Sequence, residues 1–180
     1  MTNSKYKTKK EGKSYLPYIL VLIIFINIIL YFIWPTTVLV AEHYPDNNIL
    51  YYFKVNRNSQ IGIIYTHSVE KTETSEWYKI EGDKLVLMEQ RFKSQGAGLP
   101  SDSIYKFEKN KDGYRLYDIN LEMENVIYRT GQIIANHQIN IDGKIKEFIT
   151  FSKPGDAVIF HVKNISSYEF YRWGCFNDTR

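Results

Sequence analysis

The sequence contains a single cysteine, Cys175, among 180 residues. An intramolecular disulfide is therefore excluded, so the stability of the folded chain must come from an ordinary hydrophobic core. Most of the chain also lacks a basic excess. Five of the 23 basic residues and one of the 20 acidic residues lie in the first fourteen positions, which leaves 18 and 19 for the rest. The formal net charge of +3 thus belongs to the amino-terminal tail, and we expect no nucleic-acid partner.

Residues 15–34 form one apolar and aromatic run, YLPYILVLIIFINIILYFIW, interrupted by Pro17 and Asn27. About 20 helical residues cross the hydrocarbon core of a bilayer, which is about 30 Å thick. Interfacial aromatic residues stand near both ends of the run: Tyr15, Tyr18, Tyr31 and Trp34. The run therefore predicts a transmembrane anchor, with the lipid bilayer as its surroundings.

The lysines that precede the run set its orientation. By the positive-inside rule, residues 1–14 form a cytoplasmic tail and the bulk of the chain lies outside the cell membrane, attached by a single pass. A cleaved signal peptide is the alternative. The run is longer than the usual apolar region of about 7 to 15 residues, and Leu39 is a poor −3 residue for cleavage after Ala41. We expect an uncleaved anchor.

Beyond the anchor, we expect residues 35–48 to form a juxtamembrane linker, because this segment contains Pro35, Pro45 and the turn-forming run 46–48. Residues 49–180 then show period-two patterning with frequent turn motifs, and no amphipathic helix is expected there. The expected strands cover residues 49–55, 61–69, 76–80, 84–92, 104–108, 114–119, 133–141, 144–151 and 157–162. The pattern predicts an all-β fold, a single antiparallel sandwich or barrel-like domain.

Within the expected strand 84–92, alternation would place Leu85, Leu87, Glu89 and Arg91 on one face. Because that face mixes apolar and charged side chains, we expect a half-buried strand in which Glu89 and Arg91 are either solvated or paired. Arg91 is a candidate to meet an anionic ligand or an acidic group of a partner.

The segment 65–100 contains a specific pattern: THSV at residues 66–69, a hairpin, and then E-x-R-F-x-S-x-G-A-G-L-P at residues 89–100. This pattern resembles the bacterial family called domain of unknown function 1850, closely over about 36 residues. The resemblance implies an exported domain, often encoded beside tripartite (TRAP) transporters of the TAXI class, which take up organic acids. Transporter subunits are therefore expected partners, and a small organic anion is an expected ligand.

The loop at residues 94–101 supplies part of the candidate site. Gly96 and Gly98 can adopt positive φ angles and Pro100 stiffens the exit, so successive N–H groups can converge into a nest for a carboxylate or phosphate. A plain structural bend is the alternative. The loop lacks the GK[ST] of a Walker motif and the third glycine of a dinucleotide fingerprint.

His67 and Ser68 end an apolar strand and point to opposite faces, so they cannot form a nucleophilic pair with each other. His67 and Glu89 on neighbouring strands suit metal ligation or proton transfer, or else a structural pair that holds the sheet together. His43, His137 and His161 lack metal-type spacing. We therefore expect no catalytic constellation, no metal and no cofactor.

The candidate ligand or partner site collects the polar residues and glycines of this region: His67, Ser68, Glu89, Arg91, Ser94, Gly96, Gly98 and Pro100. The first functional hypothesis is a membrane-anchored extracytoplasmic accessory or binding module. An exported metal-dependent or acid–base enzyme using His67 and Glu89 is one alternative. An envelope structural module that pairs through Asn27 is another. The aromatic tail at residues 168–173, YEFYRW, is a candidate docking strand.

Overall fold

The computed structural model of the chain describes residues 14–94, 104–131 and 135–177. The chain divides into two compact units. Residues 35–165 form a unit of β-sheets, called here the β-domain, and the residues on either side form a helical unit. The helical unit contains α1 (Leu16–Ile33) and α2 (Ser167–Asn177).

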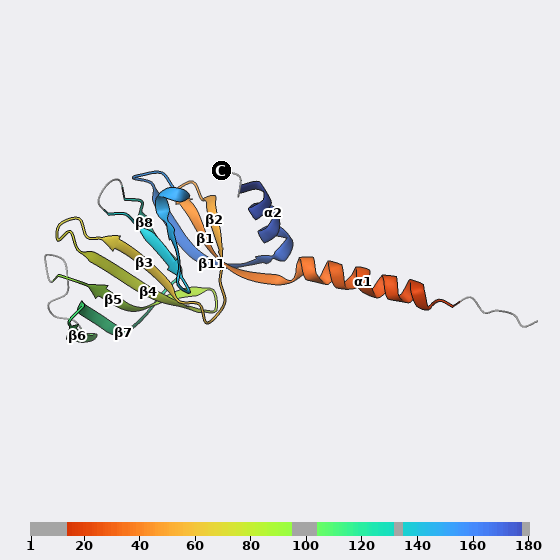
Figure 1. The fold of residues 1–180 in the computed structure, drawn as a ribbon, viewed down its shortest axis with the longest axis horizontal. Helices are drawn as coiled ribbons and strands as arrows, with labels where there is room; N and C mark the ends of the chain where they lie inside the picture. Colours follow the sequence, from red (N-terminus) through yellow and green to blue (C-terminus); the bar gives the residue numbers. More distant parts are fainter. Residues whose placement is uncertain (1–13, 95–103, 132–134, 178–180) are drawn as a thin grey trace, which may run out of the picture. The chain divides into compact units, whose positions relative to one another are not determined.

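The β-domain consists of two antiparallel sheets that stay unclosed and make a sandwich-like body (Figure 1). The smaller sheet has the order β2 (Asn48–Lys54), β1 (Pro35–Tyr44), β11 (Ala157–Ser166) and β8 (Val126–Arg129). The larger has the order β10 (Lys144–Glu147), β9 (Gln138–Ile141), β3 (Ile61–Thr66), β4 (Glu73–Glu81), β5 (Lys84–Phe92), β7 (Gly113–Met123) and β6 (Lys106–Asn110). A 3₁₀ turn, Phe148–Thr150, follows β10. The predicted all-β sandwich is confirmed.

The core lies between the sheets and draws on the inward-facing positions of both, as expected for a sandwich. Its largest fully buried side chains include Phe148, Phe160, Leu39, Ile61, Ile63, Leu85, Ile139 and Val158. Phe148 packs against Phe160 with ring centroids 5.3 Å apart. The single cysteine excludes an intramolecular disulfide, and this apolar core is the expected source of stability in its place.

The expected juxtamembrane linker is wrong over most of its length. Residues 35–44 form β1, which lies inside the smaller sheet between β2 and β11. Val38, Leu39, Val40 and Ala41 are completely buried. Pro35 is the first residue of the strand and Pro45 follows its end, where a missing N–H costs no central ladder hydrogen bond.

The carboxy-terminal aromatic segment also differs from the expectation. The structure places it in a helix, α2, whereas the sequence suggested a docking strand and no helix outside the anchor. Its aromatic residues are compatible with either state, because β-propensity depends strongly on the surroundings. The short strand β8 was not expected either.

A β-bulge changes the faces of β5. The register of β5 against β4 and β7 shifts around Met88, so Leu87 pairs with Tyr78 whereas Glu89 pairs with Trp77. An extra residue in one strand reverses the alternation beyond it. Glu89 and Arg91 therefore do not share a face with Leu85 and Leu87, contrary to the expectation from simple alternation.

Helix α1 is the only candidate membrane span in the described part of the chain. It has 18 residues, a mean hydropathy of 2.7 and no buried residue. A helix of this kind can be a signal anchor or a signal peptide.

Candidate functional site

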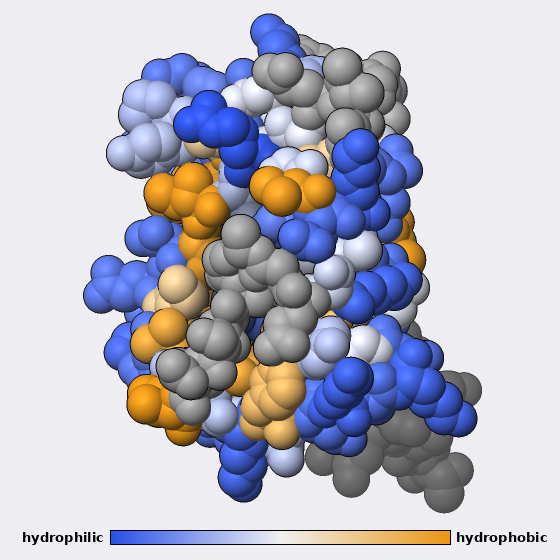
Figure 2. All heavy atoms as spheres, turned by 90° about the vertical axis from the view of Figure 1, so that its left-hand side faces the viewer, coloured by the Kyte–Doolittle hydropathy of each residue, from blue (hydrophilic) through white to orange (hydrophobic). Residues whose placement is uncertain are grey.

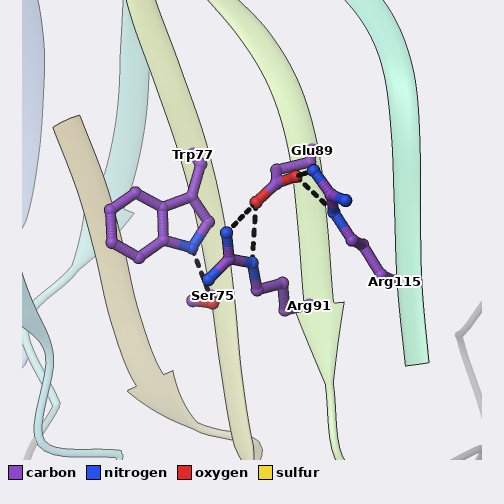
Figure 3. Close-up of polar contacts among 5 residues, drawn as sticks. All are labelled: Ser75, Trp77, Glu89, Arg91 and Arg115. Atoms are coloured by element: carbon purple, nitrogen blue, oxygen red, sulfur yellow. Dashed lines mark hydrogen bonds and ion pairs between the residues drawn. The ribbon is translucent and has the colours of Figure 1, made fainter. Parts of the chain in front are cut away.

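A buried carboxylate lies between two arginines on the outer face of the larger sheet (Figure 3). Glu89 of β5 is 7% exposed. Arg91 Nε donates to Glu89 Oε1 over 2.6 Å, and Arg91 Nη2 forms an ion pair with the same oxygen. Arg115 on β7 contacts the other oxygen, Glu89 Oε2, through both Nε and Nη2. Each guanidinium thus binds one carboxylate oxygen through two nitrogens, a charge-assisted arrangement that fixes its orientation.

Strand pairing explains why these three residues meet. Arg91 lies directly opposite Arg115 on β7, and Glu89 lies opposite Tyr117. On the other side of β5, Glu89 lies opposite Trp77 of β4. Side chains at paired positions share a face of the sheet. The bulge at Met88 is what directs Glu89 and Arg91 to this outer face.

Aromatic rings support both guanidiniums. Arg91 Cζ lies 5.0 Å from the centroid of the Trp77 ring, and Arg115 Cζ lies 5.0 Å from the centroid of Tyr117. The Trp77 indole N–H donates to Ser75 Oγ over 3.0 Å, which fixes the ring (Figure 3). Cation–π contacts of this kind restrict a guanidinium without using its N–H groups.

A cleft of about 460 Å³ opens over this cluster. The two arginines line it together with Ser75, Trp77, Lys93 and Tyr114, among others. The side chains of Arg91 and Arg115 remain 53% and 41% exposed. A cleft lined by these charged and polar side chains suits a small polar ligand. The face of the molecule drawn in Figure 2 is mostly hydrophilic, with separate hydrophobic areas.

The cleft also contains acids. Glu73 forms an ion pair with Lys93 over 3.5 Å, so these two charges compensate each other. Asp112 lies on the exposed β6–β7 turn, where water screens its charge. The trio of Glu89, Arg91 and Arg115 has a formal charge of +1. In the described part of the chain, the guanidinium N–H groups that face away from Glu89 have no protein acceptor.

The other expected site residues lie elsewhere. His67 follows β3, and its Nδ1 accepts a hydrogen bond from the Glu70 N–H over 3.3 Å. Ser94 Oγ donates to the Glu70 carboxylate over 2.8 Å, so Glu70 connects the two. Ser68 is exposed in the turn that contains Glu70. No hydrogen bond or ion pair joins His67 to Glu89 within the described ranges. Gly96, Gly98 and Pro100 lie outside the described residues.

A second carboxylate faces the sandwich interior. Glu76 Oε2 accepts hydrogen bonds from the hydroxyls of Tyr78 and Tyr128, and Gln90 Nε2 donates to Oε1 over 3.2 Å. Tyr128 belongs to the smaller sheet, so these bonds connect the two sheets. Burial and the Glu76 charge raise the pKa of Tyr65 to about 12 and raise the pKa of Tyr78 and Tyr128 as well.

The histidines occupy separate places. The His137 ring stacks on Tyr65 with centroids 5.1 Å apart, and burial lowers its pKa. His161 Nε2 lies 3.5 Å from the buried Glu42, and His43 Nδ1 lies 3.0 Å from Asp46. Over residues 14–94, 104–131 and 135–177, no group of three or more His, Cys, Asp or Glu side chains is placed to hold a metal ion.

Sequence reasoning missed Arg115, Trp77 and Ser75 as site residues. Arg115 and Tyr117 lie two positions apart on one face of β7, as Glu89 and Arg91 do on β5. This spacing was the signal that could have indicated Arg115 as a site residue. Using it requires knowing that β7 pairs with β5, and strand order is not encoded in local patterning.

The architecture defines a class: a two-sheet β-domain that carries a polar cleft on the outer face of its larger sheet and follows an apolar amino-terminal helix. Residues 61–148 match the model of the family described as "Domain of unknown function (DUF1850)", so the chain carries a domain of this family. The matched region includes every strand of the larger sheet and β8. The resemblance seen in the sequence is confirmed. No curated protein and no solved structure matches the chain.

Proposed function

We propose that this protein is a membrane-anchored, extracytoplasmic binding module that takes a small organic anion into the cleft over Arg91 and Arg115. One observation carries the proposal: two half-exposed guanidiniums that are both bound to one buried carboxylate line a cleft of about 460 Å³. Their unused N–H groups form a fixed donor array, and such an array favours a planar carboxylate.

Preorganisation gives the arrangement its value. A free arginine loses side-chain entropy when it orders around a ligand, and the contacts with Glu89, Trp77 and Tyr117 remove that cost in advance. Glu89 uses both oxygens on the arginines, so it is poorly placed to serve as a metal ligand or general base with His67. The enzyme hypothesis therefore has less structural support than binding.

The position of β1 supports an uncleaved anchor. The strand begins at Pro35, two residues after α1 ends, and Val38 to Ala41 are fully buried within the sheet. Cleavage after Ala41 would remove seven residues of β1 and break the smaller sheet. The start of β1 also lacks the pair of small residues that signal peptidase uses, because Leu39 stands at −3 before Ala41.

The location and the partner follow from further arguments. The lysine-rich tail before α1 favours a cytoplasmic amino terminus and an extracytoplasmic β-domain. The family resemblance suggests that the protein acts beside a TRAP-type transporter of organic acids. Because organic acids are anions at neutral pH, an anion-binding cleft is consistent with that role. The module would then act as an accessory to uptake and need no catalytic group.

Titration calorimetry on the full chain in detergent tests ligand binding. The probes are acetate, succinate, citrate and inorganic phosphate. We expect carboxylates to bind, and Arg91→Gln and Arg115→Gln each to weaken binding at least about tenfold, because a charge-assisted hydrogen bond contributes about 1.5–3 kcal/mol. Arg91→Lys should also weaken it, because an ammonium ion lacks the guanidinium fork.

Lys79→Gln is the matched control. Lys79 forms an ion pair with Glu81 in β4, outside the cleft lining, so its loss should leave affinity unchanged. Absence of binding by all four anions, or equal loss in the control, would overturn the anion assignment.

Partner and topology need separate measurements. Co-purification from solubilised membranes tests the transporter: if transporter subunits never accompany the chain, the accessory role fails. Protease protection of intact cells tests topology, and we expect the β-domain to be accessible from outside. An amino-terminal tag that stays attached to the mature chain would confirm an uncleaved anchor.

A further inference from the structure

The two helices of the helical unit pack at the carboxy-terminal end of α1. The Tyr31 and Tyr171 hydroxyls lie 3.2 Å apart and their rings stack at 6.5 Å, while Phe32 meets Tyr168 edge-on at 6.2 Å. Tyr168 and Tyr171 lie three residues apart in α2 and therefore share a face. Nevertheless they remain 55% and 45% exposed. The helices thus share a surface that the described residues leave exposed.

A backbone contact fixes where α2 begins. The Ser167 N–H donates to the Trp34 carbonyl over 3.0 Å, and the Ser167 hydroxyl donates to the same oxygen over 3.1 Å. Trp34 is the residue that follows α1, where tryptophan favours the boundary between hydrocarbon and water. The first turn of α2 therefore lies at the same level as this boundary.

We propose that α2 is an interfacial helix whose Tyr168–Tyr171 face lies in the headgroup region of the bilayer that surrounds α1. The occupant is lipid because the face is continuous with α1, an apolar helix in which no residue is buried. In Figure 1, α2 turns away from the axis of α1, as a helix in the membrane plane must when α1 crosses the membrane.

The composition of α2 agrees with this position. Residues 168–173 contain four aromatic side chains together with Glu169 and Arg172, and tyrosine and tryptophan concentrate at membrane boundaries because one end is apolar and the other polar. The balanced charge makes burial of aromatic surface the expected driving force, with little dependence on anionic lipid. This helix would give the anchor a second, lateral attachment.

Spin labelling of the full chain in phosphatidylcholine vesicles tests the proposal. In a Cys175→Ser background, a nitroxide is attached at Tyr168→Cys or, as the control, at Lys111→Cys on the exposed β6–β7 turn. We expect the ratio of collisions with oxygen to collisions with an aqueous nickel chelate to be at least about twofold higher at position 168, since oxygen concentrates in lipid.

Two results would overturn the assignment. Equal ratios at the two positions would place α2 in water, and shielding of position 168 from both reagents would indicate a protein partner on this face. Tyr171→Cys repeats the measurement from the next turn, which covers the case in which Tyr168→Cys disturbs the helix. The result is independent of the anion cleft.

Discussion

Glu76 and Glu89 lie on adjacent strands of one sheet and face opposite sides of it. Glu89 is held by two arginines on the outer face, whereas Glu76 is held between the sheets by neutral donors from Tyr78, Tyr128 and Gln90. Charged partners that still reach water can exchange a protein contact for a ligand. The hydroxyls that bind Glu76 are neutral donors in a part-buried site between the sheets, so their bonds to Glu76 serve the fold.

The largest expected effect is that of Glu76→Ala. It removes the carboxylate that accepts from the Tyr78 and Tyr128 hydroxyls. Because these hydroxyls also share a hydrogen bond over 2.5 Å, one donor loses its acceptor. A buried unsatisfied donor costs about 1–3 kcal/mol, so we expect a loss of about 2 kcal/mol in the free energy of unfolding. Denaturant titration of the full chain in detergent measures it. Glu81→Ala, on the exposed end of the same strand, is the control, with a change below about 1 kcal/mol. Equal losses would refute the structural role of Glu76.

Glu89→Ala should destabilise less, by about 1 kcal/mol, because the half-exposed arginines it releases become hydrated. The same titration measures the difference from Glu76→Ala. A loss as large as that of Glu76→Ala would show that the outer cluster is also a structural bond, and the contrast between the two faces would disappear.

Gly62→Ala should weaken anion binding without removing either arginine. A Cβ at this position would lie 2.8 Å from the Trp77 ring, so the ring must move and its cation–π contact with Arg91 is lost. Such a contact contributes about 0.5–1 kcal/mol at exposed sites, or about two- to fivefold in affinity by calorimetry. Gly174→Ala, where a Cβ would meet open space, should bind normally. An unchanged affinity in Gly62→Ala would show that Trp77 does not contribute to anion binding.

The smallest effect concerns pH. Burial lowers the pKa of His137, whose surroundings are Tyr65, Tyr128, Phe148 and, more weakly, Glu76. The unfolded state therefore binds the proton first, and stability is lost as pH falls below about 6.5, by at most about 1.4 kcal/mol per pH unit. His137→Phe keeps the ring and should flatten this dependence in urea midpoints measured against pH. An identical slope in both proteins would exclude His137 as its source.

Local patterning predicted the apolar helix, the sandwich and most of the strands, because these follow from the spacing of apolar residues. Strand β5 was predicted with its observed bounds, Lys84–Phe92. Strand β1 was missed because flanking prolines indicated a linker, although its run Val38–Ala41 is the most buried in the smaller sheet. The composition of this segment does not reveal that it pairs with β2 and β11, and that pairing is what makes it a strand.

The candidate site was predicted only in part. Glu89 and Arg91 were singled out, and the structure joins them directly. Their connection to Arg115 depends on the β5–β7 pairing and on the bulge at Met88, and neither leaves a local signal. His67 and Glu89 were expected on neighbouring strands, but β4 lies between β3 and β5 in the sheet and His67 follows the end of β3.

The placement of β1 beside β11 sets an order of events during folding. These two strands are neighbours in the smaller sheet and stand at opposite ends of the β-domain in the chain. In a chain anchored as we propose, β1 must stay near the membrane without β11 until the last strand has been synthesised. Such non-local pairing forms slowly.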